Sequence, residues 1–291
     1  MRWAVFKKLI MVEQTLFGLP WAVIGAILPF ADPAFANSFN WSTFGLKSVW
    51  IVLGFCFARV AGMSFNRLID RHIDADNPRT KDRSIPKGEV SPRQVMLLAW
   101  GSVIGGVVVA GLINNICLAL SPFIILLLWG YSYTKRFTML CHFVLGLIEF
   151  FAPFCAWIAI TDSLAWPPVL LGVAALASLA GMDVIYQIQD HVFDTGHKLR
   201  SIPVVLGAQG ALWVARMSHV VAVAALIWAG VLMGLSAVYF IGVGVVASLY
   251  IHYHRKINPK ALDAIPQVFF SCNTWVGLTM MAAAIGVISS S

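Results

Sequence analysis

The chain has 291 residues, of which 59% are hydrophobic and only 11% are charged, and its formal net charge is +7. Soluble domains carry about 25% charged residues, so this composition excludes a water-soluble globular protein. Only helices and closed barrels satisfy every backbone group within lipid. Because the apolar runs are continuous rather than alternating, as barrel strands would require, we predict an all-α, polytopic membrane protein.

Nine apolar runs follow one another along the chain, each close to the ~20 residues that cross a bilayer. In chain order they predict spans at 14–31, 48–65, 93–113, 116–133, 139–160, 165–182, 208–229, 232–251 and 266–288. The seventh and eighth runs are almost fused, so the boundary between them is the least sharply marked.

Basic residues gather on one side of this predicted bundle. The N-terminus and the loops after even-numbered spans share that side, and they hold the Lys and Arg residues of 2–8, 67–93, 135–136, 198–200 and 255–260. The opposite side holds only Lys47. The positive-inside rule therefore predicts a protein of the cytoplasmic (inner) membrane, with its N-terminus and these loops in the cytoplasm and its C-terminus outside. The positive charge reflects this orientation and does not indicate nucleic-acid binding.

The acidic residues concentrate in two stretches on the same side, at about 66–92 and 183–207, which hold eight of the thirteen. Asn66, Asp70 and Asp74 recur every four residues in the first stretch, and this spacing places side chains on one face of a helix. We therefore expect the second span to continue as a helix into this stretch, until Asn77 and Pro78 end it.

The second stretch repeats the pattern 120 residues later. Asp183, Gln187, Asp190 and Asp194 are three or four residues apart, so they also share one helix face, and Gly196 is the expected helix end. After its regularly spaced aspartates, each stretch contains the same tetrapeptide, RSIP, at 83–86 and at 200–203.

Carboxylates crowded on one helix face repel one another and need partners. A solvated acidic face, balanced by nearby Lys and Arg, would explain either stripe alone. Two stripes on one side, interleaved with basic residues, instead favour a polyanion bound through divalent ions. Oxygen ligands without Cys or His favour Mg²⁺, which combines one or two carboxylates with substrate phosphates. The chemistry that fits is loss of a diphosphate, assisted by cations. The candidate cations are Lys135, Arg136, Lys198, Arg83 and Arg200.

These motifs, together with "YSYTKRFT" at 131–138 and "EQTLFGLP" at 13–20, resemble the UbiA superfamily of intramembrane prenyltransferases over nearly the whole chain. The resemblance implies nine helices around a central cavity, in a single domain that covers 1–291. Members of this superfamily transfer a prenyl group from a prenyl diphosphate to an acceptor, usually an aromatic one, and they use Mg²⁺.

Carried over residue by residue, the resemblance also implies a site. Two Mg²⁺ ions would be bound together with the diphosphate by Asn66, Asp70, Asp74, Asp190 and Asp194. Asp70, Asp190 and Arg136 are the expected catalytic residues, and Asp190 would also help to activate the acceptor. The expected contacts to diphosphate or acceptor are Arg59, Arg67, Lys135, Arg136, Lys198, Arg83, Arg200, Tyr131, Asp183, Tyr186 and Gln187. The aromatic faces of Tyr131 and Tyr186 are the expected partners of an allylic cation.

Two arginines leave alternatives open. Arg67 stands where many members of the superfamily have Asp, and because Arg cannot ligate Mg²⁺ it would contact either phosphate or a lipid headgroup. Arg59 lies inside the second span, where an ionisable residue usually faces the bundle interior and has a role. It would contact the diphosphate or a carboxylate of the acceptor, or it would form a structural pair with Glu149.

The expected activity is transfer of a polyprenyl group from polyprenyl diphosphate to a small aromatic acid, 4-hydroxybenzoate, in ubiquinone biosynthesis. A dihydroxynaphthoate-type acceptor on a menaquinone route is an alternative that the motifs do not separate. A cation transporter is an alternative of another class, but it predicts charges near the bilayer midplane, whereas these acids cluster at one membrane face. The expected partners are the two substrates and membrane lipids, and no nucleic acid.

Overall fold

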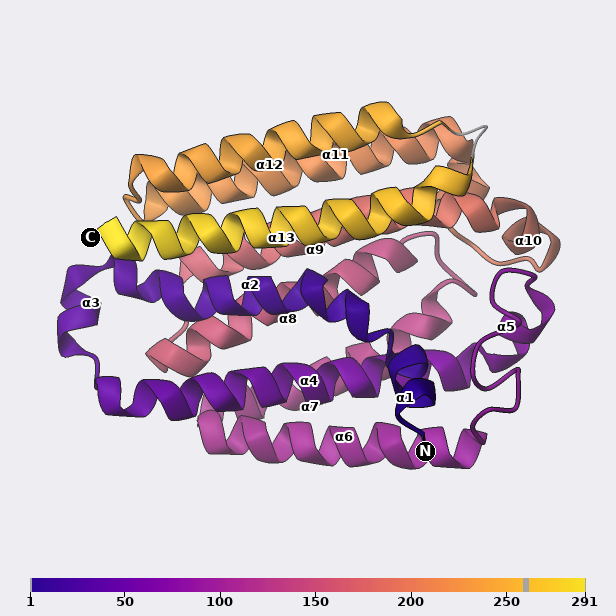
Figure 1. Cartoon of the computed structure of the whole chain (residues 1–291), viewed down its shortest axis with the longest axis horizontal. Coiled ribbons are helices and arrows are strands. Elements are labelled where there is room, and N and C mark those ends of the chain that lie inside the picture. The colour runs from indigo at the N-terminus through magenta and orange to yellow at the C-terminus, as the bar shows by residue number, and fades with distance from the viewer. Residues whose placement is uncertain (1, 259–261, 291) are drawn as a thin grey trace.

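The computed structural model describes residues 2–258 and 262–290, which fold into a bundle whose long helices run side by side along its longest axis (Figure 1). Within these residues, nine helices are long and apolar enough to cross a membrane. The predicted all-α, polytopic architecture is thereby confirmed.

The first span consists of α2 (Thr15–Ile27) and two flanking 3₁₀ turns, Val12–Gln14 and Leu28–Ala31. The later spans are α4 (Phe44–Ile69), α6 (Pro92–Ile113), α7 (Asn115–Thr134), α8 (Cys141–Thr161), α9 (Trp166–Gln187), α11 (Ile202–Leu232), α12 (Ala237–Lys256) and α13 (Ile265–Ser290). Four short helices lie at the ends of the bundle: α1 (Trp3–Ile10), α3 (Pro33–Ser38), α5 (Arg71–Asp76) and α10 (His191–Gly196).

The start of α11 corrects the expectation for the second RSIP copy. Ser201 is the N-cap residue, because its side chain accepts a hydrogen bond from the Val204 N–H, and Pro203 lies in the first turn. Ser and Pro at these positions favour a helix start. Residues 202–206 are therefore helical rather than part of a loop, and Gly207, with φ 67° and ψ 174°, kinks α11 just before the predicted start of the span at 208. The first copy, at 83–86, lies in the turns between α5 and α6.

Glycines allow two of the helix crossings to be very close. α2 packs against α8, and α8 packs against α9. A Cβ atom on Gly25 of α2 would collide with the carbonyl oxygen of Pro153, and one on Gly146 of α8 would collide with that of Leu176. Small residues at such points let helix backbones approach within a membrane. α11 and α12 pack on the other side of α9 and α13 (Figure 1).

The two short helices that carry aspartates, α5 and α10, lie at the same end of the bundle, and the C-terminal end of α13 lies at the opposite end (Figure 1). Each short helix follows a residue whose backbone angles interrupt the helix. Asp70 separates α4 from α5 with φ −91° and ψ 4°, and Asp190 precedes α10 with φ −94° and ψ 2°. The prediction of uninterrupted helices is therefore wrong at these points, whereas the predicted ends at Asn77 and Gly196 are confirmed.

Candidate active site

A cavity of about 700 Å³ lies inside the bundle. Its wall is formed by α2, α4, α6, α7, α8 and α9, by the chain around α5 and α10, and by Phe269 of α13. Among the described residues, none from α11 or α12 lines it. The cavity extends from a polar end beside α5 and α10 into an apolar interior, where side chains such as Phe55, Ile113 and Phe151 form the wall.

The first group of carboxylates lies where α4 meets α5, and it is buried and paired with cations. Asp70 and Asp74 are only 2% and 4% exposed. The Lys135 ammonium lies 3.1 Å from Asp70 Oδ2, and Arg83 Nη1 lies 2.6 Å from Asp74 Oδ1. Asn66 Nδ2 also donates to Asp70 Oδ2, at 2.9 Å. Burial raises the pKa of the Asp70 carboxyl above its ordinary value, although the Lys135 ammonium opposes this shift.

The second group lies where α9 gives way to α10, and a residue of the first stretch reaches across to it. Arg79 donates from Nε and Nη2 to the two carboxylate oxygens of Asp190, at 2.9 and 2.5 Å. Asn77 Nδ2 donates to the same carboxylate, while Gln187 Nε2 donates to Asp194 at 2.6 Å. Although burial lowers it, the hydrogen bond to Asp190 raises the pKa of Arg79 above its ordinary value. Sequence reasoning missed both Arg79 and Asn77 as site residues.

The carboxylate oxygens fit a hard cation that is bound jointly with a substrate. Within the described part of the chain, no three His, Cys, Asp or Glu side chains are grouped so that they could hold a metal ion alone. Asp70 Oδ1 and Asp74 Oδ2 are nevertheless buried without a hydrogen-bond partner, which is unfavourable for a carboxylate. Such oxygens suit Mg²⁺, because this ion uses one or two carboxylates and completes its coordination with phosphate oxygens and water.

Four of the predicted cationic side chains, Arg59, Arg67, Arg83 and Lys135, line the cavity. Arg67 is only 4% exposed, so the alternative of a lipid headgroup contact is wrong. Its Nη1 donates to Asn66 Oδ1 at 3.2 Å. The Asn66 oxygen that would face a metal is therefore hydrogen-bonded to Arg67.

The other predicted cations, Arg136, Lys198 and Arg200, are exposed and do not line the cavity. Arg200 instead connects the start of α11 to the segment between α7 and α8 by hydrogen bonds. Its backbone N–H donates to the Lys135 carbonyl oxygen at 2.6 Å, and its guanidinium donates to that of Phe137 at 3.0 Å. The structure does not bring Lys198 and Arg200 to the cavity, because the chain before α11 turns them outward. Arg136 stays near the site, with Nη2 at 3.7 Å from Asp70 Oδ1.

The remaining predicted residues, Tyr131, Asp183, Tyr186 and Gln187, all line the cavity. Asp183 has a buried partner that sequence reasoning missed. His142, which is 1% exposed, lies with Nδ1 at 2.7 Å from Asp183 Oδ2, and its Nε2 accepts from the Ile202 N–H at 3.4 Å. No motif or spacing marks His142, since it lies in another helix and is brought to Asp183 only by packing of α8 on α9.

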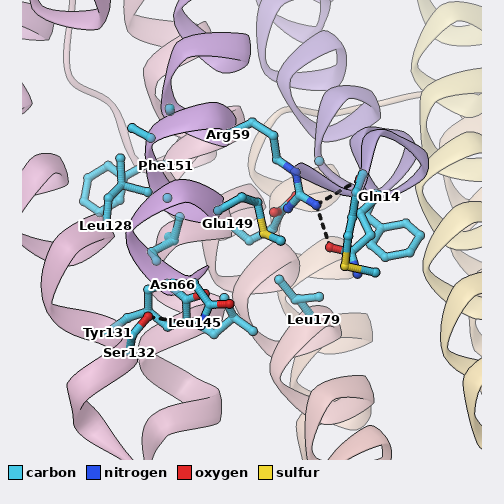
Figure 2. Close-up of a pocket in the computed structure, with 18 of the residues that line it drawn as sticks. Gln14, Arg59, Asn66, Leu128, Tyr131, Ser132, Leu145, Glu149, Phe151 and Leu179 are labelled. Atoms are coloured by element: carbon cyan, nitrogen blue, oxygen red, sulfur yellow. Dashed lines mark hydrogen bonds between the residues drawn. The ribbon is translucent and has the colours of Figure 1, made fainter. Parts of the chain in front are cut away.

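Arg59 and Glu149 also line the cavity, and Gln14 lies beside Arg59 (Figure 2). No direct hydrogen bond or ion pair joins the two side chains, although each lies within the electrostatic influence of the other. Arg59 Nη2 instead donates to Gln14 Oε1 at 2.5 Å and to the carbonyl oxygens of Met11 and Ile10. Gln14 was not predicted as a site residue, because it lies 45 residues from Arg59 in the sequence and no motif connects the two.

Known proteins that are similar to this chain belong to one family. The model of the UbiA prenyltransferase family matches residues 21–284. The chain is similar to the 4-hydroxybenzoate octaprenyltransferase of Nitrosospira multiformis, with 28% identity over 80% of each chain. It is similar to the enzyme of the same name from Vibrio cholerae, with 30% identity over 80% of this chain and 82% of the relative.

Solved structures agree on the fold. A UbiA homolog from Aeropyrum pernix K1, solved without ligand, matches with a TM-score of 0.82 and 28% identity over 94% of this chain and 98% of the other. A UbiA homolog from Archaeoglobus fulgidus bound to GPP and Mg²⁺ matches with a TM-score of 0.75 and 20% identity over 98% and 99% of the two chains, which shows the fold alone. The match of the family model across nearly the whole chain shows that this protein belongs to the UbiA prenyltransferase family.

Proposed function

We propose that this prenyltransferase is Mg²⁺-dependent and attaches a polyprenyl group to 4-hydroxybenzoate, in ubiquinone biosynthesis. The observation that carries the proposal is the set of four buried aspartates, in two groups, at one end of a cavity with an apolar interior. The polar end suits a diphosphate with its cations, and the apolar interior suits a prenyl chain. The names of the relatives support the acceptor, and the Archaeoglobus fulgidus homolog bound to GPP and Mg²⁺ supports the donor and the metal.

In this proposal the metal is held together with the diphosphate by Asn66, Asp70, Asp74, Asp190 and Asp194. Bound Mg²⁺ would neutralise the negative charge that grows on the leaving diphosphate. The cations that now pair with the aspartates are within reach of the same anion and would stabilise it further. They are Lys135, Arg79 and Arg83.

The acceptor would lie on the prenyl side of the diphosphate, between α4, α8 and α9. As the bond from prenyl C1 to the diphosphate oxygen breaks, the electron pair leaves with the diphosphate, and a ring carbon of the acceptor forms the new bond to C1. That ring carbon then gives up its proton to an oxygen of the released diphosphate, which restores the aromatic ring. Asp183, held by His142, is positioned to bind the acceptor, and the faces of Tyr131 and Tyr186 would stabilise the allylic cation. Water must be excluded during this step, and the turns at 77–90, tied to Asp190 by Arg79, would cover the polar end.

The same proposal includes the location of the enzyme. Basic residues gather at the end of the bundle that carries α5 and α10, which supports an inner-membrane protein with this end in the cytoplasm. A water-soluble diphosphate leaving group and an aromatic acid would then be exchanged with the cytoplasm, while the prenyl chain stays in the membrane.

The proposal is tested with the purified protein in detergent, given octaprenyl diphosphate, Mg²⁺ and either 4-hydroxybenzoate or a dihydroxynaphthoic acid, with products identified by mass. We expect a prenylated hydroxybenzoate, and none after chelation of Mg²⁺. Product with the naphthoic acid alone would overturn the assignment of 4-hydroxybenzoate as the acceptor. If neither acid gives a product and the protein conducts ions in vesicles, the proposed enzymatic function is overturned.

A pair of variants tests the site. Asp70→Asn and Asp190→Asn should each lower turnover at least a hundredfold, because each removes a charge that holds the metal and diphosphate. Asp76→Asn is the matched control, since Asp76 lies in the same short helix as Asp74 but is exposed and does not line the cavity. Full turnover in both site variants would show that the aspartates are wrongly assigned.

A further inference from the structure

A second hollow, the outer groove, lies on the surface of the bundle between α4, α6 and α7. It has a volume of about 770 Å³, and its wall is formed by the last turns of α4 and α7, the first turns of α6 and the start of α5. α4, α6 and α7 pack against one another along one side of the bundle (Figure 1). Of the described residues that line the outer groove, only Ile73 also lines the active-site cavity, so the two hollows are separate sites.

Two arginines are fixed at the polar end of the outer groove by the last carbonyl groups of α4. Arg71 Nη1 donates to the Leu68 carbonyl oxygen at 2.7 Å, and Arg136 Nη2 donates to that of Ile69 at 3.0 Å. The guanidinium carbon of Arg136 also lies 4.8 Å from the centre of the Tyr133 ring. A guanidinium carries five N–H donors, and these hydrogen bonds use only one nitrogen of each arginine. Both side chains are therefore preorganised to donate further hydrogen bonds to an anion.

The outer groove has an excess of positive charge. His72 lines it together with the two arginines, and no Asp or Glu of the described part of the chain does. Asp70 Oδ1 lies 3.7 Å from Arg136 Nη2 on the side of the active-site cavity, but the Asp70 carboxylate is already paired with the Lys135 ammonium at 3.1 Å. Because opposite charges attract most strongly where water is partly excluded, this end of the groove favours a negatively charged ligand.

Away from the arginines, the outer groove is apolar and aromatic. Met96, Trp100 and Trp129 line it, and they are 51%, 49% and 43% exposed. The centre of the Trp129 ring lies 5.2 Å from that of the Tyr133 ring. Trp100 follows Pro92, the first residue of α6, by eight residues, which is about 12 Å along the helix axis. The groove therefore runs from the helix ends into the part of the bundle that lipid would surround.

A phospholipid with a net negative charge matches both parts of the outer groove. The planar fork of arginine suits phosphate oxygens, and basic pockets between spanning helices bind anionic headgroups. Tryptophans are favoured at the level of the headgroups, where they would contact the start of an acyl chain. A zwitterionic headgroup would place its own cation beside the two arginines. A second copy of this chain, inserted in the same direction, would bring its own basic end against this one.

We propose that the outer groove binds one anionic phospholipid, whose phosphate lies between Arg71 and Arg136 and whose acyl chain lies along Trp100 and Trp129. Arg136 would then bind a lipid phosphate outside the active-site cavity, rather than the diphosphate that the sequence suggested. Neither substrate is needed for this binding, so it is independent of the proposed function.

The test measures lipid binding to the purified protein in detergent by native mass spectrometry. The probes are phosphatidylglycerol, which is anionic, and phosphatidylcholine, which is zwitterionic, with identical acyl chains. In wild type we expect one phosphatidylglycerol to bind about tenfold more tightly than phosphatidylcholine, the difference expected from one hydrogen bond to a charged group. This preference should vanish in Arg71→Gln/Arg136→Gln. It should be reduced in Arg71→Lys, which keeps the charge but loses the planar fork.

A charge-matched variant is the control for this experiment. Lys7→Gln/Lys81→Gln removes two positive charges from exposed positions outside the outer groove, and it should keep the full preference for phosphatidylglycerol. An equal loss of preference in this variant would show that only the net charge attracts the lipid, and the assignment to the groove would be wrong.

The other outcomes also decide the proposal. A wild type without preference between the two lipids overturns it. Displacement of phosphatidylglycerol by an equal concentration of glycerol phosphate would show that the groove binds soluble phosphates and needs no acyl chain. A dimer that phosphatidylglycerol leaves intact and that Trp129→Ala dissociates would show that a second copy occupies the groove. If the double arginine variant does not fold, Arg71→Lys and the comparison of the two lipids in wild type still decide. Turnover is not measured, so a failure of the proposed function would leave these results unchanged.

Discussion

Single side chains join parts of the site that lie far apart in the sequence. Arg79 and Asp190 are 111 residues apart, yet one guanidinium contacts both carboxylate oxygens, and 32% of the Arg79 side chain remains exposed. Breaking a pair whose carboxylate is buried leaves an uncompensated charge, which costs more than the pair itself contributes. Arg79 therefore ties the turns at 77–90, which lie over the polar end, to the buried Asp190 carboxylate.

Arg79→Lys tests this contact, because it keeps the charge but removes the planar, two-pronged donor. We expect Arg79→Lys to lower kcat/KM for the prenyl diphosphate by about tenfold, and Arg79→Ala by more, since a hydrogen bond to a charged group contributes about 1.5–3 kcal/mol. Steady-state kinetics would show this. Lys81→Ala, an exposed neighbour in the same turns, is the control, and wild-type kinetics in Arg79→Ala would contradict the role.

His142 is predicted to act on the acceptor side through Asp183. In His142→Leu the Asp183 carboxylate loses its donor at 2.7 Å, so we expect the KM for the acceptor to rise about tenfold while the KM for the prenyl diphosphate is unchanged. His142→Gln offers an amide donor and should restore most of the affinity. Equal effects on both substrates, or no rescue by Gln, would point to a purely structural role.

At the level of helices, the two acidic stretches adopt the same local design. A long helix breaks at an aspartate, and a six-residue helix follows whose fourth residue is the second aspartate, giving Asp70 with Asp74 in α5 and Asp190 with Asp194 in α10. The backbone angles of Asp70 and Asp190 lie in the sparsely populated region that active-site residues often occupy. The break turns each short helix so that the aspartate at the break and the aspartate at its fourth position are buried at the cavity rather than spread along one exposed stripe.

The walls of the cavity depend on close crossings between helices, and the substitution Gly25→Ala tests the crossing of α2 with α8. Gly25→Ala forces α2 away from the Pro153 backbone of α8, and overpacking of this kind costs about 1–3 kcal/mol. We expect a lower melting temperature in detergent, measured by differential scanning fluorimetry. Gly130→Ala is the matched control, because a Cβ on Gly130 of α7 meets no atom within 4 Å, and it should leave the melting temperature unchanged or raise it. An equal effect of both changes would contradict the crossing argument.

For the molecule as a whole, the charges at its two ends predict its orientation in the membrane. The end opposite α5 and α10 holds Lys47, whose positive charge is paired with Asp162 at 2.9 Å and thereby largely offset. The excess of free positive charge therefore lies at the end with the aspartates, which should face the cytoplasm.

This orientation is checked by fusing reporters to the C-terminus in a bacterial host. Fused to the C-terminus, a phosphatase that folds only outside the cytoplasm should be active. A fluorescent protein that folds only in the cytoplasm should not fluoresce at the same position. The same reporters joined after Lys256, at the end of α12, should give the reverse result. A fluorescent C-terminal fusion would show that the bundle is inserted the other way.

The sequence alone predicted the nine spans and the two acidic groups, for definite physical reasons. A bilayer requires about 20 apolar residues per helix, so the spans can be read from composition, and the regular spacing of Asp70 with Asp74 and of Asp190 with Asp194 reflects the helical repeat. The assignments to Mg²⁺ and diphosphate are proposals that the buried, partly unpartnered aspartates support.

Only the tertiary structure decided which partner each of these residues has. Arg79 meets Asp190, His142 meets Asp183, and Gln14 rather than Glu149 meets Arg59, all across different helices. Local spacing carries no information about such contacts, because they depend on which helices pack together and on how closely their glycines let them approach. For the same reason the two RSIP copies, identical in sequence, have different structures: the first lies in the turns near the cavity, whereas the second starts a helix and turns Arg200 away from it.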